Sequence, residues 1–152
     1  MEEKKAKMKA KVLEAVANDV KVDIEYIDAE LINSLDDVKR FTKGCSGIVV
    51  PGGFGERGTE GKIFAAQYAR ENNIPYLGIC LGLQIAVIDY ARNVLGIKDA
   101  NSTEINPNTT NPVIHILEGQ TDLLQKGGTM RLGKYDCILN KDSLSYKLYG
   151  TD

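Results

Sequence analysis

The sequence has few cysteines and almost no histidine, and both shortages exclude kinds of site. Its three cysteines, Cys45, Cys80 and Cys137, lie far apart, and no Cys-x-x-Cys pair occurs among the 152 residues. This spacing argues against a zinc site or a disulfide framework and favours a reducing compartment. His115 is the only histidine. Cys–His chemistry carried out within this sequence would therefore have to use it.

Excess charge and long apolar runs are missing as well. A formal net charge of -2 gives no electrostatic reason to bind nucleic acid or an anionic membrane. No apolar run approaches the length of a membrane span, and the N-terminal stretch is rich in lysine, glutamate and alanine, unlike a signal peptide. A hydrophobic content of 43% over 152 residues suits one domain with one core. We therefore expect a cytoplasmic protein that binds neither nucleic acid nor membrane.

Predicted strands and helices alternate along the chain, which favours an α/β fold with a mostly parallel sheet and helices on both faces. The expected elements are a helix at Glu2–Ala17, a strand at Val20–Tyr26, one or two short helices within Asp28–Thr42, a buried strand at Gly47–Val50, a helix at Gly61–Glu71, a strand at Ile74–Ile79, a helix from Gln84 to about Leu95, a strand at Val113–Leu117, a loop or short helix at Glu118–Lys126, a hairpin at Gly127–Leu139 and a helix at Ser143–Tyr149. The lysines of the first helix are better explained as its solvated face than as a binding patch.

A cysteine between two glycines, at the junction of a strand and a helix, is the central feature of the sequence. The segment reads Gly78-Ile79-Cys80-Leu81-Gly82. A nucleophile on a sharp strand-to-helix turn is the elbow of α/β hydrolases, here with cysteine in place of serine. Glycines avoid collisions of β-carbons with the neighbouring strand and helix, and the helix N-terminus favours a thiolate. The backbone N–H of Leu81 can stabilise an oxyanion. The alternative is a buried structural cysteine.

A glycine-rich loop follows the strand at Gly47–Val50. It begins Pro51-Gly52-Gly53 and runs to Gly58, at the strand's carboxyl end, where ligand sites of open α/β sheets form. A right-handed crossover between parallel neighbours would place it beside Cys80, so we favour an oxyanion role for its backbone. The loop lacks the Gly-Lys-Ser/Thr and GxGxxG patterns, which leaves phosphate binding weakly supported. A tight structural turn is the other explanation.

Two further polar residues are candidates for the site. His115 falls in the strand predicted at Val113–Leu117, on the face opposite Ile114 and Ile116, and nothing in the sequence places that face near Cys80. We therefore expect His115 to occupy an ordinary polar position. Glu104 is the one carboxylate of a polar, turn-rich stretch between residues 100 and 112.

Five segments together carry a family resemblance. They are Val50–Gly58, Arg70–Gln84, Ala91–Val94, Asn101–Glu104 and Gly127–Gly133. Through them the chain resembles the glutaminase domain of CTP synthases, a branch of the class I glutamine amidotransferases, from about Val12 to Gly150. The elbow alone indicates only the broad class, and the Pro-Gly-Gly-Phe-Gly, Ser-Thr-Glu and Thr-Met-Arg segments narrow it. The resemblance implies a three-layer αβα, flavodoxin-like fold.

The resemblance also implies a reaction. In this family a cysteine thiolate attacks the carboxamide of L-glutamine and releases ammonia, and the glutamyl thioester is then hydrolysed. A separate synthase domain uses the ammonia, with ATP and magnesium, to convert UTP to CTP. By resemblance, Cys80 is the nucleophile and Glu104 holds the α-amino group of glutamine, a role that requires a fixed carboxylate. The oxyanion hole and the walls of the glutamine pocket are assigned to Gly52, Gly53, Leu81, Gly82, Leu83 and Gln84.

The chain departs from the family pattern in three respects. First, the sequence does not contain the C-terminal His-x-Glu motif or the Arg/His-rich segment that precedes it. Second, it does not contain the opening strand with its Gly-Lys-Tyr segment. Third, it does not contain the synthase domain. We therefore expect residues 1–152 to form a single partial amidotransferase domain, with no metal or cofactor of its own. Its partners would be L-glutamine and a synthase domain in the same chain or another. Without its base a thiol is a poor nucleophile, so we expect little or no activity from the chain alone.

Two other functions stay open at this point. A different cysteine hydrolase of the same fold class, such as a γ-glutamyl peptidase or a DJ-1-like protein, would share the elbow, but the Ser-Thr-Glu and Thr-Met-Arg-Leu-Gly segments argue against it. A non-catalytic remnant that binds glutamine or a partner would account for the missing His-x-Glu motif. The joint presence of Cys80, Gly53 and Glu104 indicates catalytic ancestry.

Overall fold

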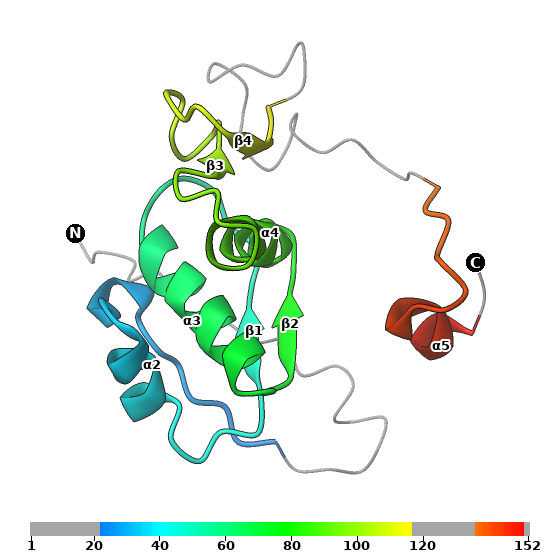
Figure 1. Ribbon diagram of the computed structural model, residues 1–152. Coiled ribbons are helices and arrows are strands. Elements are labelled where there is room, and N and C mark those ends of the chain that lie inside the picture. Colours follow the sequence, from blue (N-terminus) through cyan, green and yellow to red (C-terminus); the bar gives the residue numbers. More distant parts are fainter. Residues whose placement is uncertain (1–21, 117–135, 151–152) are drawn as a thin grey trace. The chain divides into compact units, whose positions relative to one another are not determined.

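The computed structural model describes residues 22–116 and 136–150 (Figure 1). The chain divides into two units, Met1–Ile116 and Leu117–Asp152. In the first unit the elements are η1 (Ala29–Leu31), α2 (Leu35–Phe41), β1 (Ile48–Val50), α3 (Thr59–Glu71), β2 (Tyr76–Gly78), α4 (Leu81–Asn93), β3 (Asn101–Ser102) and β4 (Pro112–Ile114). In the second unit, α5 spans Leu144–Tyr149. The helix predicted at Glu2–Ala17 and the segment Glu118–Lys126 lie outside the described residues.

The parallel pair of β1 and β2 organises the first unit. Its register pairs Ile48 with Tyr76, Val49 with Leu77 and Val50 with Gly78. The continuous apolar run of β1 forms a strand with two buried residues, as predicted for a covered strand. Figure 1 shows α3 and α4 side by side against this pair. Because α3 connects two neighbouring parallel strands, β1 and β2 end at the same edge of the sheet, as predicted.

Apolar side chains on two sides of α3 build the core. One cluster joins α2 and β1 to α3, and its buried members are Ile32, Val38, Ile48, Val50, Ala65 and Ala69. A second cluster joins α3 to α4 and contains Ile63, Ala66, Leu81, Ile85 and Ile88. Burying each isoleucine, leucine or valine of these clusters stabilises the fold by about 1.5–3 kcal/mol. Because α4 begins directly after Cys80, this packing also fixes the position of the elbow.

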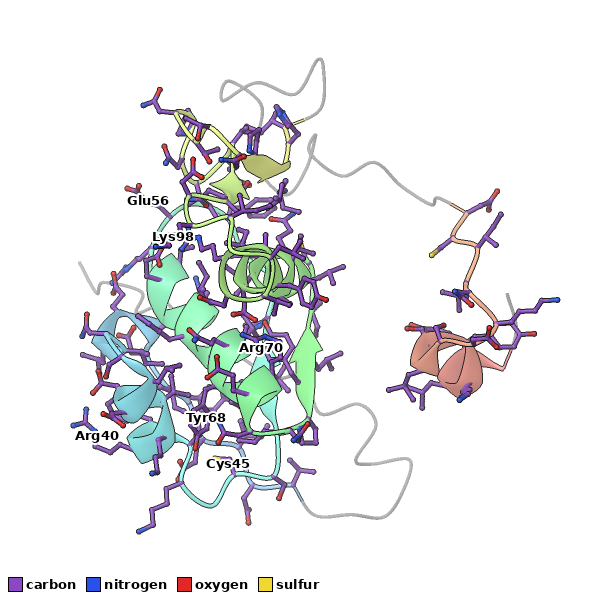
Figure 2. All side chains as sticks on the ribbon, in the orientation of Figure 1. Arg40, Cys45, Glu56, Tyr68, Arg70 and Lys98 are labelled. Atoms are coloured by element: carbon purple, nitrogen blue, oxygen red, sulfur yellow. The ribbon has the colours of Figure 1, made fainter. Side chains whose placement is uncertain are left out.

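A partly buried ion pair gives a second connection between α3 and α4. Asp89 is 2% exposed, and its carboxylate accepts hydrogen bonds from Arg70 Nε at 2.9 Å, Arg70 Nη2 at 3.3 Å and Asn93 Nδ2 at 2.8 Å. Arg70 is labelled in Figure 2. The bond to Asp89 raises the pKa of Arg70 above its ordinary value. A buried carboxylate is tolerated only when it is paired in this way. The pair therefore sets the rotation of α4 against α3.

The strand predicted at Val20–Tyr26 is wrong for residues 22–26. They lie outside regular secondary structure, and Val22 and Tyr26 are 47% and 52% exposed. Alternating apolar residues specify which side chains a strand would bury, but a strand also needs a neighbour that exchanges backbone hydrogen bonds with it. The described strands pair only as β1 with β2 and β3 with β4.

β3 and β4 form a second, very short parallel pair with an irregular register. Between residues 100 and 117 the sequence predicts a single strand, at Val113–Leu117, and β4 ends at Ile114, so that prediction holds in part. β3 was missed because its two residues are polar. Asn101 and Ser102 are nevertheless buried, and the Asn101 N–H donates to the Asn111 carbonyl at 3.2 Å. Burial of polar residues in a strand carries no apolar signal in the sequence.

The second unit contains one confirmed helix. α5 forms as predicted, and the hydroxyl of Ser143 accepts a hydrogen bond from the Tyr146 N–H at 3.1 Å at its N-terminus. Residues 136–139 are not a strand, so the predicted hairpin is wrong there, and its remainder lies outside the described residues. Within residues 22–116 and 136–150, no helix is long and apolar enough to cross a membrane.

Candidate active site

Cys80 lies on a strained turn between β2 and α4. Its φ and ψ are 55° and -107°, a conformation that a residue with a β-carbon rarely adopts. It occupies the N-cap position of α4, and its side chain is exposed. The exposure excludes the alternative of a buried structural cysteine. The predicted elbow is therefore confirmed.

The two glycines around Cys80 allow the backbones of β1, β2 and α4 to approach one another. A β-carbon on Gly82 would lie 2.0 Å from the carbonyl oxygen of Val50, and one on Gly78 would lie 2.5 Å from the Gly82 carbonyl carbon and oxygen. Both distances are far below a van der Waals contact. The Ile79 N–H donates to the same Val50 carbonyl at 2.9 Å. Any other residue at position 78 or 82 would push the elbow off the sheet.

Tyr76 supports the elbow from inside the sheet. Its hydroxyl donates a hydrogen bond to the Gly82 carbonyl at 2.8 Å. Burial raises the pKa of Tyr76 well above its ordinary 10.0, and the negative charge of Asp89 adds to the shift. The hydroxyl is therefore protonated and able to donate at neutral pH. This contact was not predicted, because in the sequence Tyr76 is only one residue of an apolar strand.

The glycine-rich loop passes beside Cys80, as predicted. A β-carbon on Gly52 would lie 3.3 Å from Cys80 Cβ and 3.9 Å from Cys80 Sγ, and one on Gly53 would lie 3.5 Å from Leu81 Cδ2. Among the described residues, no acceptor is bound by the backbone N–H of Gly53 or of Leu81. Backbone N–H groups without an acceptor are suited to stabilising negative charge on an oxygen.

Glu104 contacts the same loop from a distant part of the chain. The Gly55 N–H donates to Glu104 Oε1 at 3.0 Å. The Glu104 N–H in turn donates to the hydroxyl of Ser102 at 3.2 Å, and Ser102 is only 2% exposed. The loop thus touches Cys80 at one end and a fixed carboxylate three residues further on. The sequence placed Glu104 in the site only through the family resemblance.

The other residues considered for the site differ in exposure. Leu81 is 3% exposed and belongs to the core, so it offers the site its backbone rather than its side chain. Gly82 is buried, Gln84 is partly exposed and Leu83 is 61% exposed. His115 is exposed just beyond the end of β4, which agrees with an ordinary polar position.

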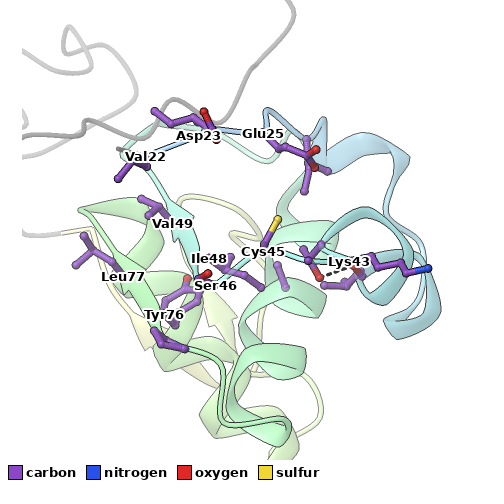
Figure 3. A pocket seen from close by; sticks show the side chains of 18 of the residues that line it. Val22, Asp23, Glu25, Lys43, Cys45, Ser46, Ile48, Val49, Tyr76 and Leu77 are labelled. Carbon is purple, nitrogen blue, oxygen red and sulfur yellow. Dashed lines mark hydrogen bonds between the residues drawn. The ribbon is translucent and has the colours of Figure 1, made fainter. Parts of the chain in front are cut away.

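A cavity of about 790 Å³ lies at the opposite end of the strands from Cys80. Figure 3 shows Val22, Val49 and Leu77 on one side of it and Cys45 and Lys43 on the other. The cavity is lined by the amino ends of β1 and β2 and by the irregular segment that was expected to be a strand. It is therefore separate from the carboxyl edge where Cys80, Gly52 and Glu104 meet.

Comparison with known proteins identifies the family. The profile of the family described as "Glutamine amidotransferase class-I" matches residues 6–151. The chain belongs to this family. The elbow with its cysteine and the adjacent glycine-rich loop are thus parts of an amidotransferase domain.

The most similar curated proteins include several CTP synthases. The chain is 53% identical to the CTP synthase of Clostridium kluyveri over 136 residues, which are 90% of this chain and 25% of that protein. It is 56% identical to the CTP synthase of Caldanaerobacter subterraneus subsp. tengcongensis over 128 residues, 84% of this chain and 24% of that protein. The chain thus spans about a quarter of the length of these relatives. The resemblance seen in the sequence is confirmed.

A solved structure confirms the fold class. The glutaminase domain of Trypanosoma brucei CTPS with bound acivicin superposes with a TM-score of 0.74 at 38% identity, and the match covers 91% of this chain and 53% of that one. The αβα fold expected from the sequence is therefore that of the amidotransferase family, although the described residues show only two short parallel pairs of its strands.

Proposed function

We propose that this chain is the glutamine-hydrolysing part of a CTP synthase and that Cys80 is its nucleophile. The observation that carries the proposal is the meeting of three segments: the exposed Cys80, the Gly52–Gly53 backbone against it, and the Glu104 carboxylate at Gly55. The similarity to CTP synthases over about 90% of the chain supports it. So does the amidotransferase family match over residues 6–151.

The geometry suits an acyl-transfer reaction. The Cys80 thiolate attacks the carboxamide carbon of L-glutamine, and the N–H groups of Gly53 and Leu81 stabilise the oxyanion. The C–N bond then breaks, ammonia leaves with an added proton, and water hydrolyses the thioester to glutamate. Glu104 binds the α-ammonium group through charge-assisted hydrogen bonds. Gly52, Gly82, Leu83 and Gln84 form the walls around the side chain of the substrate.

The proton transfers need a base, and we propose that it comes from outside residues 1–152. His115 is the only histidine of the sequence and is exposed beyond β4. The ammonia would pass to a synthase domain, in the same chain or another, where ATP and magnesium act. The chain itself needs no cofactor for the steps above. A cytoplasmic location is part of the proposal and is supported by the three unpaired cysteines, two of them exposed.

Labelling with 6-diazo-5-oxo-L-norleucine, a glutamine analogue that alkylates activated amidotransferase cysteines, tests the proposal. The expected result by intact mass and peptide mapping is one adduct, confined to Cys80 and suppressed by L-glutamine. Cys137 is a matched control because it is also exposed, and the variant Cys80→Ala gives no adduct. Equal reaction of Cys137, or no adduct on Cys80, would refute the proposed site.

A further inference from the structure

Arg92 in the last turn of α4 makes contacts that the proposed reaction does not yet use. Its side chain is 16% exposed. Arg92 Nε donates to the Ala100 carbonyl at 2.7 Å, and Arg92 Nη1 lies 3.0 Å from both carboxylate oxygens of Glu60 on α3. One guanidinium thus joins α3, α4 and the segment that enters β3.

These contacts lie on a short path from the nucleophile to Glu104. α4 begins directly after Cys80 and reaches Arg92 after twelve residues, a rigid span of roughly 18 Å at 1.5 Å per residue. Ala100 immediately precedes β3, whose Ser102 accepts the Glu104 N–H at 3.2 Å. The Glu104 carboxylate then accepts the Gly55 N–H. Every link of this path is a rigid helix, a hydrogen bond or a few residues of held backbone.

We propose that Arg92 is a positioning residue that sets where Glu104 stands relative to Cys80. The inference rests on the proposed function, because it takes Cys80 as nucleophile and Glu104 as the ammonium ligand.

The chemistry of arginine suits this role. Its planar guanidinium donates from separate nitrogens along fixed directions, whereas a lysine ammonium is a single point of charge. The Glu60 side chain is 65% exposed, so its ion pair adds little stability by itself. The bond to the Ala100 carbonyl is shorter and less exposed, and it is the contact that reaches the β3 segment. Arg92→Gln removes both contacts of the guanidinium, whereas Glu60→Gln removes only the ion pair, so comparing the two variants isolates the bond to the Ala100 carbonyl.

The first test follows the amide resonance of Gly55 by NMR, which needs no reaction. Its N–H is bound to Glu104, so Glu104→Gln shifts the resonance. We expect Arg92→Gln to shift it in the same direction and Glu60→Gln to leave it unchanged. Arg92→Lys, which can hold only one of the two partners, gives an intermediate shift. An unchanged Gly55 resonance in Arg92→Gln, with the Tm lowered, would make Arg92 a packing residue only and overturn the inference.

The second test compares two alkylating reagents on Cys80. 6-Diazo-5-oxo-L-norleucine must be recognised through its α-ammonium group, whereas iodoacetamide only reports the reactivity of the thiol. Since misplacing a binding group by about 1 Å can cost up to roughly a hundredfold, we expect Arg92→Gln to slow the first reagent by about ten- to a hundredfold. The iodoacetamide rate of Arg92→Gln equals that of the parent chain. A loss of both rates in Arg92→Gln overturns the inference, since the thiol itself would then have been disturbed.

The variant Glu104→Gln distinguishes the failure of this inference from that of the proposed function. If Glu104→Gln leaves the reaction with 6-diazo-5-oxo-L-norleucine unchanged, Glu104 is not the ammonium ligand and the role of Arg92 is refuted with it, whereas an adduct confined to Cys80 still supports the proposed nucleophile. If Glu104→Gln slows the reaction and Arg92→Gln does not, the proposed function stands and the role of Arg92 is refuted.

Discussion

Gly82 shows how little space the elbow leaves at the level of single residues. Gly82 is the second residue of α4, and within a helix alanine is favoured over glycine by up to about 1 kcal/mol. The sequence keeps glycine there because a β-carbon would lie 2.0 Å from the Val50 carbonyl oxygen. The loss of helix propensity is thus offset by the close approach of α4 to β1. That approach is what holds Cys80 in its strained, exposed conformation.

Replacing this glycine tests the argument. We expect Gly82→Ala to destabilise the chain by at least about 1–3 kcal/mol, the usual cost of overpacking, in spite of the better helix propensity. Urea unfolding followed by circular dichroism measures the difference. Gly53→Ala is the matched control, because its β-carbon would make an ordinary contact of 3.5 Å with Leu81 Cδ2. Equal stability of the two variants would show that the elbow can relax.

At the level of single residues, predictions succeeded where the spacing of neighbouring residues in the sequence is enough to define a local structure. Two glycines at fixed distances from Cys80, directly after an apolar run, were enough to predict the elbow. The approach of Glu104 to Gly55 spans 49 residues and was available only from the family resemblance. The bond from Arg92 to the Ala100 carbonyl was not predictable, because a backbone acceptor leaves no mark in the sequence. The ion pair of Asp89 was also missed, although here the sequence does contain a signal: a carboxylate lies on the apolar face of α4.

At the level of elements, strands were predicted well only where their partners could also be predicted. β1 and β2 are continuous apolar runs joined by one helix, and both were found at the expected positions. Residues 22–26 have the apolar alternation of a strand, but no described strand pairs with them. β3 does pair with a neighbouring strand, but its own two residues lack an apolar pattern. The apolar pattern of a strand determines which of its faces is buried, whereas its pairing partner is determined by other parts of the chain.

The contact between β2 and α4 gives a pH-dependent prediction through Tyr76. We expect Tyr76→Phe to lower the free energy of unfolding by about 1 kcal/mol at pH 7, because the Gly82 carbonyl loses a donor. The folded pKa of Tyr76 lies above the unfolded value, so the folded state holds its proton more tightly. This contribution is complete below pH 10.0, the ordinary pKa, and is lost as the pH rises above it.

Urea titrations of both proteins between pH 8 and about pH 11 measure this difference. The stability of the parent chain falls more steeply above pH 10.0 than that of Tyr76→Phe, so the two curves converge. The other tyrosines titrate equally in both proteins and cancel in the comparison. Curves that stay parallel up to the highest pH would mean that Tyr76 ionises as readily in the folded chain as in the unfolded one.

At the level of the whole molecule, the described core and the described site belong to the first unit. Both buried clusters and all the contacts around Cys80 fall within residues 22–116. The β1–β2 sheet has two strands, and α3 and α4 cover one of its faces. Leu77 is 55% exposed and lines the 790 Å³ cavity together with Val49. Within the described part of the chain, a packed site is therefore combined with an apolar sheet surface that is exposed.

This combination predicts marginal stability and a tendency to associate. We expect a Tm below about 70 °C, within the range of ordinary mesophilic domains, and light scattering that increases with concentration. Leu77→Lys places a charge on the open surface and removes little buried contact, so it should reduce scattering without lowering the Tm. Leu81→Ala is the matched control, because that leucine is 3% exposed and its truncation costs about 2–5 kcal/mol. A Tm loss in Leu77→Lys as large as that in Leu81→Ala would show that Leu77 is part of a closed core in solution.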